Sequence, residues 1–321
     1  MDWASARAGF NFNNAEAISS DASFRRYFRL VGENESRVVM DAPPEHEATA
    51  PFVDVARRLA KAGLNVPAVL AENRDRGFLL LTDMGDQPWH HVLTEKNSDA
   101  LFGDALRALS KMQRGVECEG LPEYDAALLL RELSLFPDWF LAHHWRVEPT
   151  DSELDDWEMV CMTLIRWALD QPRVFVHRDF MPRNLMASDP NPGILDFQDA
   201  VLGPITYDPV CLFRDAFLSW SPDRVDTWLE DYRMRAQTDG LPVTENPHLW
   251  QRSCDLMGVQ RHLKVLGIFA RIRYRDGKPK YLDDAPRFFS YLKLAIDRNP
   301  ELAPLERLVG AWRARARPAD I

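Results

Sequence analysis

Two short runs of the sequence, 175–186 and 194–199, carry the residues best suited to chemistry. Asp179 follows an apolar stretch typical of a buried strand, and a carboxylate placed there can accept a hydrogen bond from an attacking hydroxyl. Asn184 lies five residues further on, and Asp196 ends a second short apolar stretch. Amide and carboxylate oxygens are suitable ligands for Mg²⁺. The spacing therefore predicts Asp179 as a base or hydroxyl-orienting group beside a magnesium site formed by Asn184 and Asp196, as phosphoryl transfer requires.

The neighbours of these residues fit the same interpretation. His177 begins a His-Arg-Asp run that is followed, after four residues, by an asparagine, which is the spacing of a kinase catalytic loop. We expect His177 to order this loop rather than to touch substrate, and Asp199 to be a further metal or substrate contact. The alternative is that these polar groups only cap two strand ends, but three elements in the right order favour catalysis. Asp208 before Pro209 predicts a helix N-cap that is also able to brace the catalytic loop.

The elements that must position these residues fall into two lobes with an α+β organisation. A first lobe, 1–85, combines a small antiparallel sheet with a helix, and the second lobe, 86–321, is mostly helical. Asp151 or Ser152 is the expected N-cap of the helix that precedes the catalytic loop. The predicted strands are 23–30, 37–40, 66–70, 77–81, 173–176 and 193–197, and the predicted helices are 50–62, 99–115, 126–145 and 152–168, with further helices from about 209 onward.

Composition limits the possible partners of the protein. The 321 residues include 39 lysines and arginines against 49 acidic residues, a formal charge of -10, which disfavours broad binding to nucleic acid or to anionic membranes. The four cysteines are far apart, so we expect reduced thiols. No apolar run is long enough to span a membrane, and the first residues do not resemble a signal peptide. These features predict a cytoplasmic protein.

The motifs resemble those of the aminoglycoside phosphotransferase/choline kinase group, whose fold is protein-kinase-like and two-lobed. The resemblance rests on His177-x-Asp179-x4-Asn184, on the run 195–199 and on the pair Tyr207-Asp208, and it extends over nearly the whole chain. Segments 38–45, 175–186 and 260–271 are similar to the anomeric N-acetylmuramate/N-acetylglucosamine kinases of bacterial cell-wall recycling. This resemblance implies ATP and Mg²⁺ as cofactors and an amino sugar 1-phosphate as product, which a nucleotidyltransferase would then use in peptidoglycan recycling.

The first lobe departs from the general kinase pattern. Kinases cover the phosphates with a glycine-rich loop and contact them with a strand lysine, but segment 19–26 has no glycine and segment 38–41 has no lysine. We expect Ser20 and Ser23 to let backbone N–H groups approach the triphosphate, and Arg25 or Arg26 to replace the missing cation. The alternative is an ordinary hairpin with solvated arginines. By analogy with the kinase hinge, Thr82, Asp83 and Met84 are expected to lie beside adenine.

Two helical stretches are candidates for contact with the sugar. Glu132, Phe136 and Trp139 are spaced to share one helix face, where two aromatic rings and a carboxylate suit a carbohydrate, although aromatic residues at this spacing are usually core. The second stretch is cationic and includes His262 and Lys264, which suits the carboxylate of a lactyl sugar, although such charges are often only solvated. Arg214 is a similar candidate.

Other functions stay open from the sequence. A kinase of aminoglycosides, choline or another small alcohol would share the catalytic residues, whereas the missing lysine permits a catalytically inactive regulator that binds nucleotide. Retention of Asp179, Asn184 and Asp196 favours an enzyme, and the cationic segment 261–273 disfavours a polycationic antibiotic as acceptor.

Overall fold

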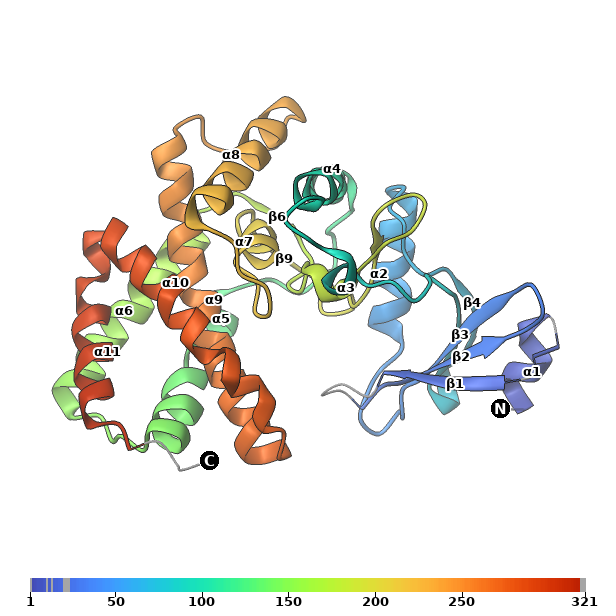
Figure 1. Cartoon of the computed structure of the whole chain (residues 1–321), viewed down its shortest axis with the longest axis horizontal. Helices are drawn as coiled ribbons and strands as arrows, with labels where there is room; N and C mark the ends of the chain where they lie inside the picture. The colour runs from blue at the N-terminus through green and yellow to red at the C-terminus, as the bar shows by residue number, and fades with distance from the viewer. Residues whose placement is uncertain (1, 10, 13, 20–23, 318–321) are drawn as a thin grey trace. The chain divides into compact units, whose positions relative to one another are not determined.

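The computed structural model describes residues 2–9, 11, 12, 14–19 and 24–317 (Figure 1). Its chain packs into two compact units, which are described separately. The first unit contains Met1–Glu119 and His177–Ala200, and the second contains Gly120–Val176 and Val201–Ile321. Packing thus groups segments 86–119 and 177–200 with the first lobe, and the lobe boundary at residue 85 stays a prediction.

The first unit is built on a five-stranded antiparallel sheet in the order β1-β2-β3-β5-β4. The predicted hairpin and the helix after it are confirmed, and Gly63, with a φ of 74°, turns the chain just beyond that helix. The predicted strand 66–70 begins three residues later, because Pro67 lacks an N–H for the ladder and the N–H of Ala68 bonds to the Thr82 side chain. The strands are β1 Asn14–Ser19, β2 Arg26–Val31, β3 Ser36–Asp41, β4 Val69–Asn73 and β5 Phe78–Thr82.

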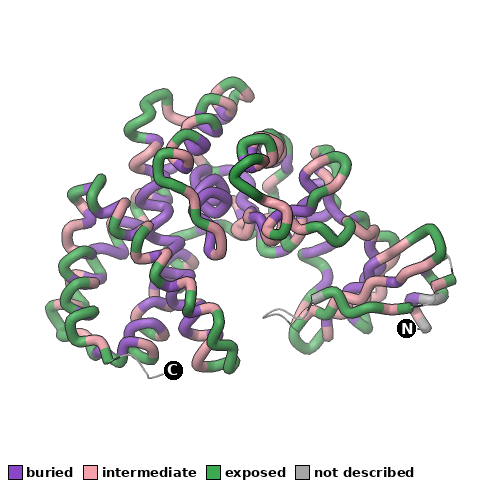
Figure 2. Tube along the Cα trace, viewed as in Figure 1, coloured by how far each residue is buried: buried purple, intermediate pink, exposed green. Residues whose placement is uncertain are grey.

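Short elements complete the first unit. The helix α2 buries an apolar face that includes Phe52, Val55 and Leu59 (purple in Figure 2), which is why it stays attached despite its polar outer face. In the loop region, the expected strand 193–197 is wrong beyond Ile194, because Asp196 has a φ of 64°, outside the strand region. The helical elements are α1 Asp2–Ala8, α2 Ala50–Lys61, η1 Arg74–Arg76, α3 Trp89–Val92, α4 Ser98–Gly115 and η3 Pro182–Asn184, with β7 Leu185–Met186 paired to β8 Gly193–Ile194.

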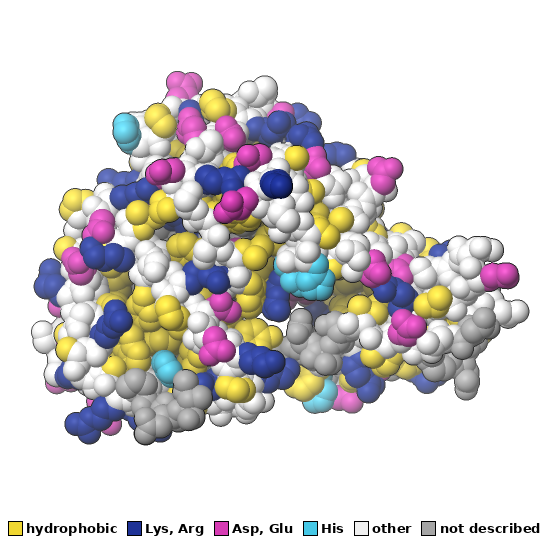
Figure 3. All heavy atoms as spheres, in the orientation of Figure 1, with side chains coloured by type: hydrophobic (Ala, Val, Ile, Leu, Met, Phe, Trp, Pro, Cys, Tyr) yellow, Lys and Arg dark blue, Asp and Glu magenta, His cyan; other side chains and the backbone are white. Residues whose placement is uncertain are grey.

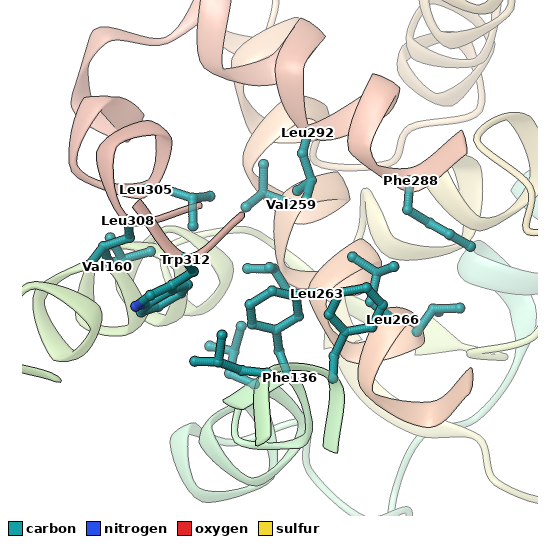
Figure 4. Packing of buried hydrophobic residues seen from close by; sticks show 14 of the residues in the cluster. Phe136, Val160, Val259, Leu263, Leu266, Phe288, Leu292, Leu305, Leu308 and Trp312 are labelled. Carbon is teal, nitrogen blue, oxygen red and sulfur yellow. The ribbon is translucent and has the colours of Figure 1, made fainter. Parts of the chain in front are cut away.

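The second unit is a helical assembly around the long helix α9, with one small two-stranded sheet, β6–β9. Side chains around the whole middle of α9 are buried, as expected for a central helix. Gly267 allows this packing, because a Cβ there would lie 2.3 Å from the backbone of Leu135. Figure 4 shows Leu263 and Leu266 of α9 in one hydrophobic cluster with Phe136 and Trp312.

Three sequence predictions for the second unit need correction. The single helix expected over 126–145 is interrupted after Leu133, since Pro137 cannot donate an i→i−4 hydrogen bond, and the chain continues as a π-helix. The N-cap of α6 is Thr150, which forms a capping box with Glu153, and not Asp151 or Ser152. The N-cap of α7 is Thr206, so Asp208 lies in the first turn of that helix.

The elements of the second unit, in chain order, are α5 Ala126–Leu133, η2 Phe136–Trp145, α6 Asp151–Leu169, β6 Arg173–Val176, β9 Val201–Pro204, α7 Tyr207–Phe213, α8 Pro222–Thr238, α9 Pro247–Asp276, η4 Pro279–Asp284, α10 Ala285–Arg298, η5 Pro300–Leu302 and α11 Ala303–Arg315. The four cysteines are free thiols. Among the described helices, none has the length and apolar character needed to cross a membrane.

Candidate active site

The predicted catalytic residues come together within the first unit. The side-chain amide nitrogen of Asn184 donates to the backbone oxygen of Asp179 at 2.9 Å and lies 3.4 Å from Oδ2 of Asp196. These two contacts join the two sequence runs that carry the predicted chemistry. Because the amide nitrogen is engaged in this way, the amide oxygen of Asn184 is the atom left to act as a metal ligand.

His177 supports the loop from the protein interior. Its side chain is fully buried, and Nδ1 accepts a hydrogen bond from the backbone N–H of Asp179 at 3.3 Å. Burial lowers the pKa of His177 to about 4, against the opposing effect of Asp179, so the ring is neutral near pH 7 and Nδ1 can accept this bond. His177 thus contacts the loop backbone from the interior, and its role in ordering the loop stays a prediction.

The backbone is strained at two positions of the site. Arg178 and Asp196 have φ values of 74° and 64°, in the left-handed region that is uncommon for residues other than glycine. Strain of this kind persists only where the surroundings hold it, and such residues cluster at functional sites. Arg178 is tied to the Asp196 run by a 3.3 Å bond from its guanidinium to the backbone oxygen of Asp199.

The carboxylates of the site repel one another. Asp196 remains open to solvent, but the protein atoms crowded around its carboxyl remove much of its hydration, and Asp179 and Asp199 add negative charge. Together these effects raise the pKa of Asp196 to about 6, even though Gln198 donates to its Oδ1 at 2.9 Å. Gln198 also lies 3.4 Å from Oδ2 of Asp199, so one amide bridges both carboxylates. Gln198 was not among the predicted site residues, although its place between the two aspartates in sequence was a usable signal.

This donor set fits a hydrated magnesium ion that is completed by phosphate oxygens. Within the described ranges, no cluster of three or more histidine, cysteine and acidic side chains is arranged to hold a metal by itself. Mg²⁺, however, is usually held by one or two carboxylates together with substrate phosphates rather than by an all-protein cage. The mutual repulsion around Asp196 is the electrostatic feature that a cation would relieve.

The predicted phosphate-binding residues are placed only in part. Ser20 and Ser23 lie outside the described residues. Arg25 pairs with Glu47 at 2.7 Å, and its charge acts on both Asp196 and Tyr27. Arg26 pairs with Asp41 and is largely exposed. Of the two candidate cations, the structure therefore brings Arg25 within electrostatic reach of Asp196.

The expected hinge residues are held by contacts within the first unit. Asp83 pairs with Arg29 at 2.6 Å and accepts from the N–H of Gly85 at 3.0 Å. Burial opposes ionisation of Asp83, but these bonds prevail and lower its pKa. The side chain of Thr82 accepts from the N–H of Ala68 at 2.9 Å, so both polar side chains serve the fold, and their place beside adenine stays a prediction. Met84 packs beside Gly193, where a Cβ would lie 2.6 Å from its methyl group.

The candidate sugar contacts lie in the second unit. Glu132 is buried and pairs with Lys264 at 2.6 Å, and Phe136 is fully buried in the core while Trp139 is half-buried. The buried His262 ring is stacked on Tyr291, with centroids 4.9 Å apart. The predicted contact of each with sugar stays a prediction, since the described interactions of these residues are with other parts of the unit.

Arg214 combines an internal partner with access to a pocket. Its guanidinium pairs with the buried Asp255 at 2.5 Å and donates to the backbone oxygen of Cys254 at 3.2 Å. The same residue lines a pocket of the second unit beside α10.

The chain is similar in sequence to a known family and to curated proteins. Residues 14–245 match the model of the phosphotransferase enzyme family. The chain is 56% identical over 293 residues to a protein of Pseudomonas aeruginosa named N-acetylmuramate/N-acetylglucosamine kinase, covering 91% of this chain and 87% of that protein. A Pseudomonas putida protein of the same name is 52% identical over 315 residues, covering 98% and 92% respectively.

Solved structures support the fold. A crystal structure of an ADP-bound aminoglycoside phosphotransferase superposes with a TM-score of 0.60 at 17% identity, covering 92% of this chain and 97% of that one. At this identity the likeness concerns the fold alone, and it confirms the predicted kinase-like α+β class.

Proposed function

We propose that this protein, which belongs to the phosphotransferase enzyme family, transfers the γ-phosphoryl group of ATP to the anomeric hydroxyl of N-acetylmuramate, N-acetylglucosamine or both. The arrangement of Asp179, Asn184 and Asp196 carries the proposal of phosphoryl transfer. The name of the two Pseudomonas relatives, at 56% and 52% identity, supports the choice of acceptor.

The proposed reaction gives each residue a defined task. The acceptor oxygen forms a bond to the γ-phosphorus, the bond from that phosphorus to the bridging oxygen breaks, and ADP leaves. Asp179 orients the hydroxyl and takes its proton, while Asn184 and Asp196 would hold Mg²⁺. When bound, Mg²⁺ neutralises charge on the phosphate oxygens. His177 fixes the backbone of Asp179 from the interior.

Arg25 is the proposed replacement for the strand lysine of other kinases. In protein kinases that lysine forms an ion pair with a glutamate, and the pair must be in place for activity. Arg25 pairs with Glu47 at 2.7 Å, and its guanidinium is mostly buried, with 11% of the side chain exposed. Its charge favours the ionised form of Asp196, which a metal ligand requires. We therefore propose Arg25, rather than the exposed Arg26, as the phosphate cation, with Ser20 and Ser23 nearby in sequence.

The sugar 1-phosphate product implies a place in a reaction sequence. A nucleotidyltransferase is the class of enzyme that would consume it, in agreement with a role in peptidoglycan recycling. Because ATP is the donor, a cytoplasmic location is part of the same proposal.

One assay tests the proposal directly. The purified protein is incubated with magnesium–ATP and either sugar, and both ADP release and the reducing end are followed. We expect release of ADP with equimolar loss of the reducing end. ADP release with the reducing end intact would place the phosphate elsewhere on the sugar. Turnover only with choline or an aminoglycoside would indicate another alcohol kinase, and nucleotide binding without turnover would indicate a regulator.

A further inference from the structure

A pocket of about 1080 Å³ opens in the second unit beside α10. Its lining includes the aromatic side chains of Phe140, Trp145 and Phe289, and Figure 3 shows hydrophobic side chains exposed on the surface of the second unit. Polar side chains also line it, including Ser219 after α7 and Arg287 and Tyr291 of α10. A pocket lined by both aromatic and polar side chains suits a ligand that carries both methyl and hydrogen-bonding groups.

The pocket lining contains a donor whose bonding capacity is only partly used. Arg287 pairs through Nη2 with Asp284 at 3.1 Å, and 21% of its side chain is exposed. Its Nη1 is buried and has no hydrogen-bond partner among the described residues. Since a guanidinium binds a carboxylate best through two parallel N–H groups, Arg287 retains the capacity to bind an anion from the pocket.

A buried carboxylate that does not itself line the pocket interacts electrostatically with Arg287. Asp215 is 1% exposed, and its Oδ1 accepts the backbone N–H groups of Phe217 and Leu218 at 2.7 and 2.8 Å. Its Oδ2 is buried without a hydrogen-bond partner in the described part of the chain. Arg287 acts electrostatically on Asp215, and both act on the hydroxyl of Tyr291, which lies 3.4 Å from the hydroxyl of Ser219.

These groups select a particular ligand chemistry. Buried polar groups in proteins are nearly always hydrogen-bonded, so the unused donor of Arg287 in the pocket lining indicates a missing partner. A carboxylate satisfies Arg287, and hydroxyl or amide groups of the same ligand can bond to Ser219 and Tyr291. Methyl groups of that ligand match the aromatic side chains of the lining.

We propose that this pocket binds the substituents of an N-acylated sugar acid such as N-acetylmuramate, with Arg287 pairing with the carboxylate and the hydroxyls of Ser219 and Tyr291 bonding to its hydroxyl or amide groups. The inference rests on the proposed function and makes Arg287 a specificity-determining residue for that reaction. It requires only contacts within the second unit. N-acetylglucosamine lacks the carboxylate, so its binding does not depend on the charge of Arg287.

The test compares Arg287→Gln with a matched variant, Arg307→Gln, which removes the same charge from an exposed position on α11. We expect Arg287→Gln to raise the KM for N-acetylmuramate about 10- to 100-fold, the range for a lost hydrogen bond between charged groups. Its KM for N-acetylglucosamine should change less than about twofold, and kcat should be nearly constant, since the interaction holds the ground state and the transition state alike. Arg307→Gln should leave all constants unchanged.

Equal changes for both sugars, or no change for either, overturn the assignment of Arg287. Calorimetric titration of the wild-type protein with each sugar, without nucleotide, separates this inference from the proposed function. Binding of N-acetylmuramate that Arg287→Gln weakens, without turnover in the wild type, supports the pocket and refutes the kinase activity. Turnover of both sugars with an unchanged preference in Arg287→Gln keeps the activity and refutes the pocket.

A measurement on the wild-type protein covers the case in which Arg287→Gln does not fold. Phenylglyoxal labels accessible arginines, and mass spectrometry reports the extent of labelling at Arg287. N-acetylmuramate should slow labelling of Arg287 and leave labelling of Arg307 unchanged, whereas N-acetylglucosamine should protect Arg287 much less. Equal labelling of Arg287 with and without N-acetylmuramate would count against the proposal.

Discussion

Replacement of Lys264 by methionine should destabilise the second unit strongly. Nζ of Lys264 lies 2.6 Å from Oε1 of Glu132, and the side chains are 11% and 6% exposed. Oε2 of Glu132 accepts from the hydroxyl of Tyr124 and from the amide of Gln260, the latter at 3.1 Å, while Lys264 also donates to the hydroxyl of Tyr207 at 3.1 Å. The ion pair therefore joins α5 and α9 through a hydrogen-bonded cluster.

The size of the expected loss in stability follows from the charge that remains on Glu132 when Lys264 is replaced. Methionine preserves most of the volume of Lys264, so little cavity forms, but the buried Glu132 loses the cation with which it pairs at 2.6 Å. Removal of one partner from a buried ion pair costs about 3–5 kcal/mol, because an uncompensated charge remains in the interior. The hydrogen bonds from Tyr124 and Gln260 that Glu132 retains favour the lower end of this range.

The assay is urea unfolding followed by tryptophan fluorescence, with the free energy of unfolding obtained by linear extrapolation. The double variant Glu132→Leu, Lys264→Met should recover most of the lost stability, because no buried charge then remains. Lys293→Met is the control, since Lys293 is an exposed lysine of α10 whose acidic partners also lie at the surface. It should change stability little.

Two results would contradict this reasoning. If Lys264→Met unfolds like the wild type but has a sharply raised KM for the sugar, Lys264 is a substrate contact and its pairing with Glu132 is not a structural requirement. A double variant that is no more stable than Lys264→Met would also refute the reasoning, because it would show that the lone charge of Glu132 is not the source of the cost.

Three further predictions concern the first unit. Asp179→Asn should lower kcat at least about 100-fold while ATP binding, measured by calorimetry, stays within about threefold, since the carboxylate acts on the acceptor hydroxyl; unchanged kcat would remove Asp179 from its role. Arg25→Gln should raise the KM for ATP about tenfold or more, whereas Arg26→Gln, at an exposed ion pair, should have little effect; equal effects would contradict the choice of Arg25. Because the pKa of Asp196 is raised to about 6, protons should compete with Mg²⁺ for this carboxylate as the pH falls through that value. The concentration of free Mg²⁺ that gives half the maximal rate, measured at constant magnesium–ATP, should therefore rise below about pH 6. If this concentration is the same from about pH 7.5 to about pH 5, the competition is refuted.

The sequence was sufficient for the catalytic geometry because that geometry is local. Asp179 and Asn184 belong to one loop, and Asp196 follows within a dozen residues, so order and spacing already restrict how they can meet. The strand and helix positions were largely predictable for the same reason, since each depends on short-range periodicity. Errors occurred where one residue overrides the pattern, as Pro137 interrupts the helix expected over 126–145.

The polar partners of the second unit were not predictable in this way. Lys264 and Glu132 are far apart in sequence, and Arg214 meets Asp255 only when α7 packs on α9. A cationic residue on a helix has the same local pattern whether it faces solvent, ligand or a buried carboxylate. Arg287 and Asp215 carried no motif at all, because what distinguishes them is an unused hydrogen-bonding group, and that is defined only by three-dimensional surroundings.

The residues proposed for chemistry and those proposed for acceptor choice belong to different units, so variants should affect them separately. All the residues proposed for phosphoryl transfer lie in the first unit, and the groups proposed to read the acceptor's substituents lie in the second. Changes at Asp179 or Asp196 should therefore act on kcat with every acceptor, whereas changes at Arg287 should act on the choice between acceptors at nearly constant kcat. Arg25 differs from both, since this proposed phosphate cation acts electrostatically on Asp196, the proposed metal ligand. Kinetics with both sugars and with ATP thus assign each variant to donor binding, chemistry or acceptor choice.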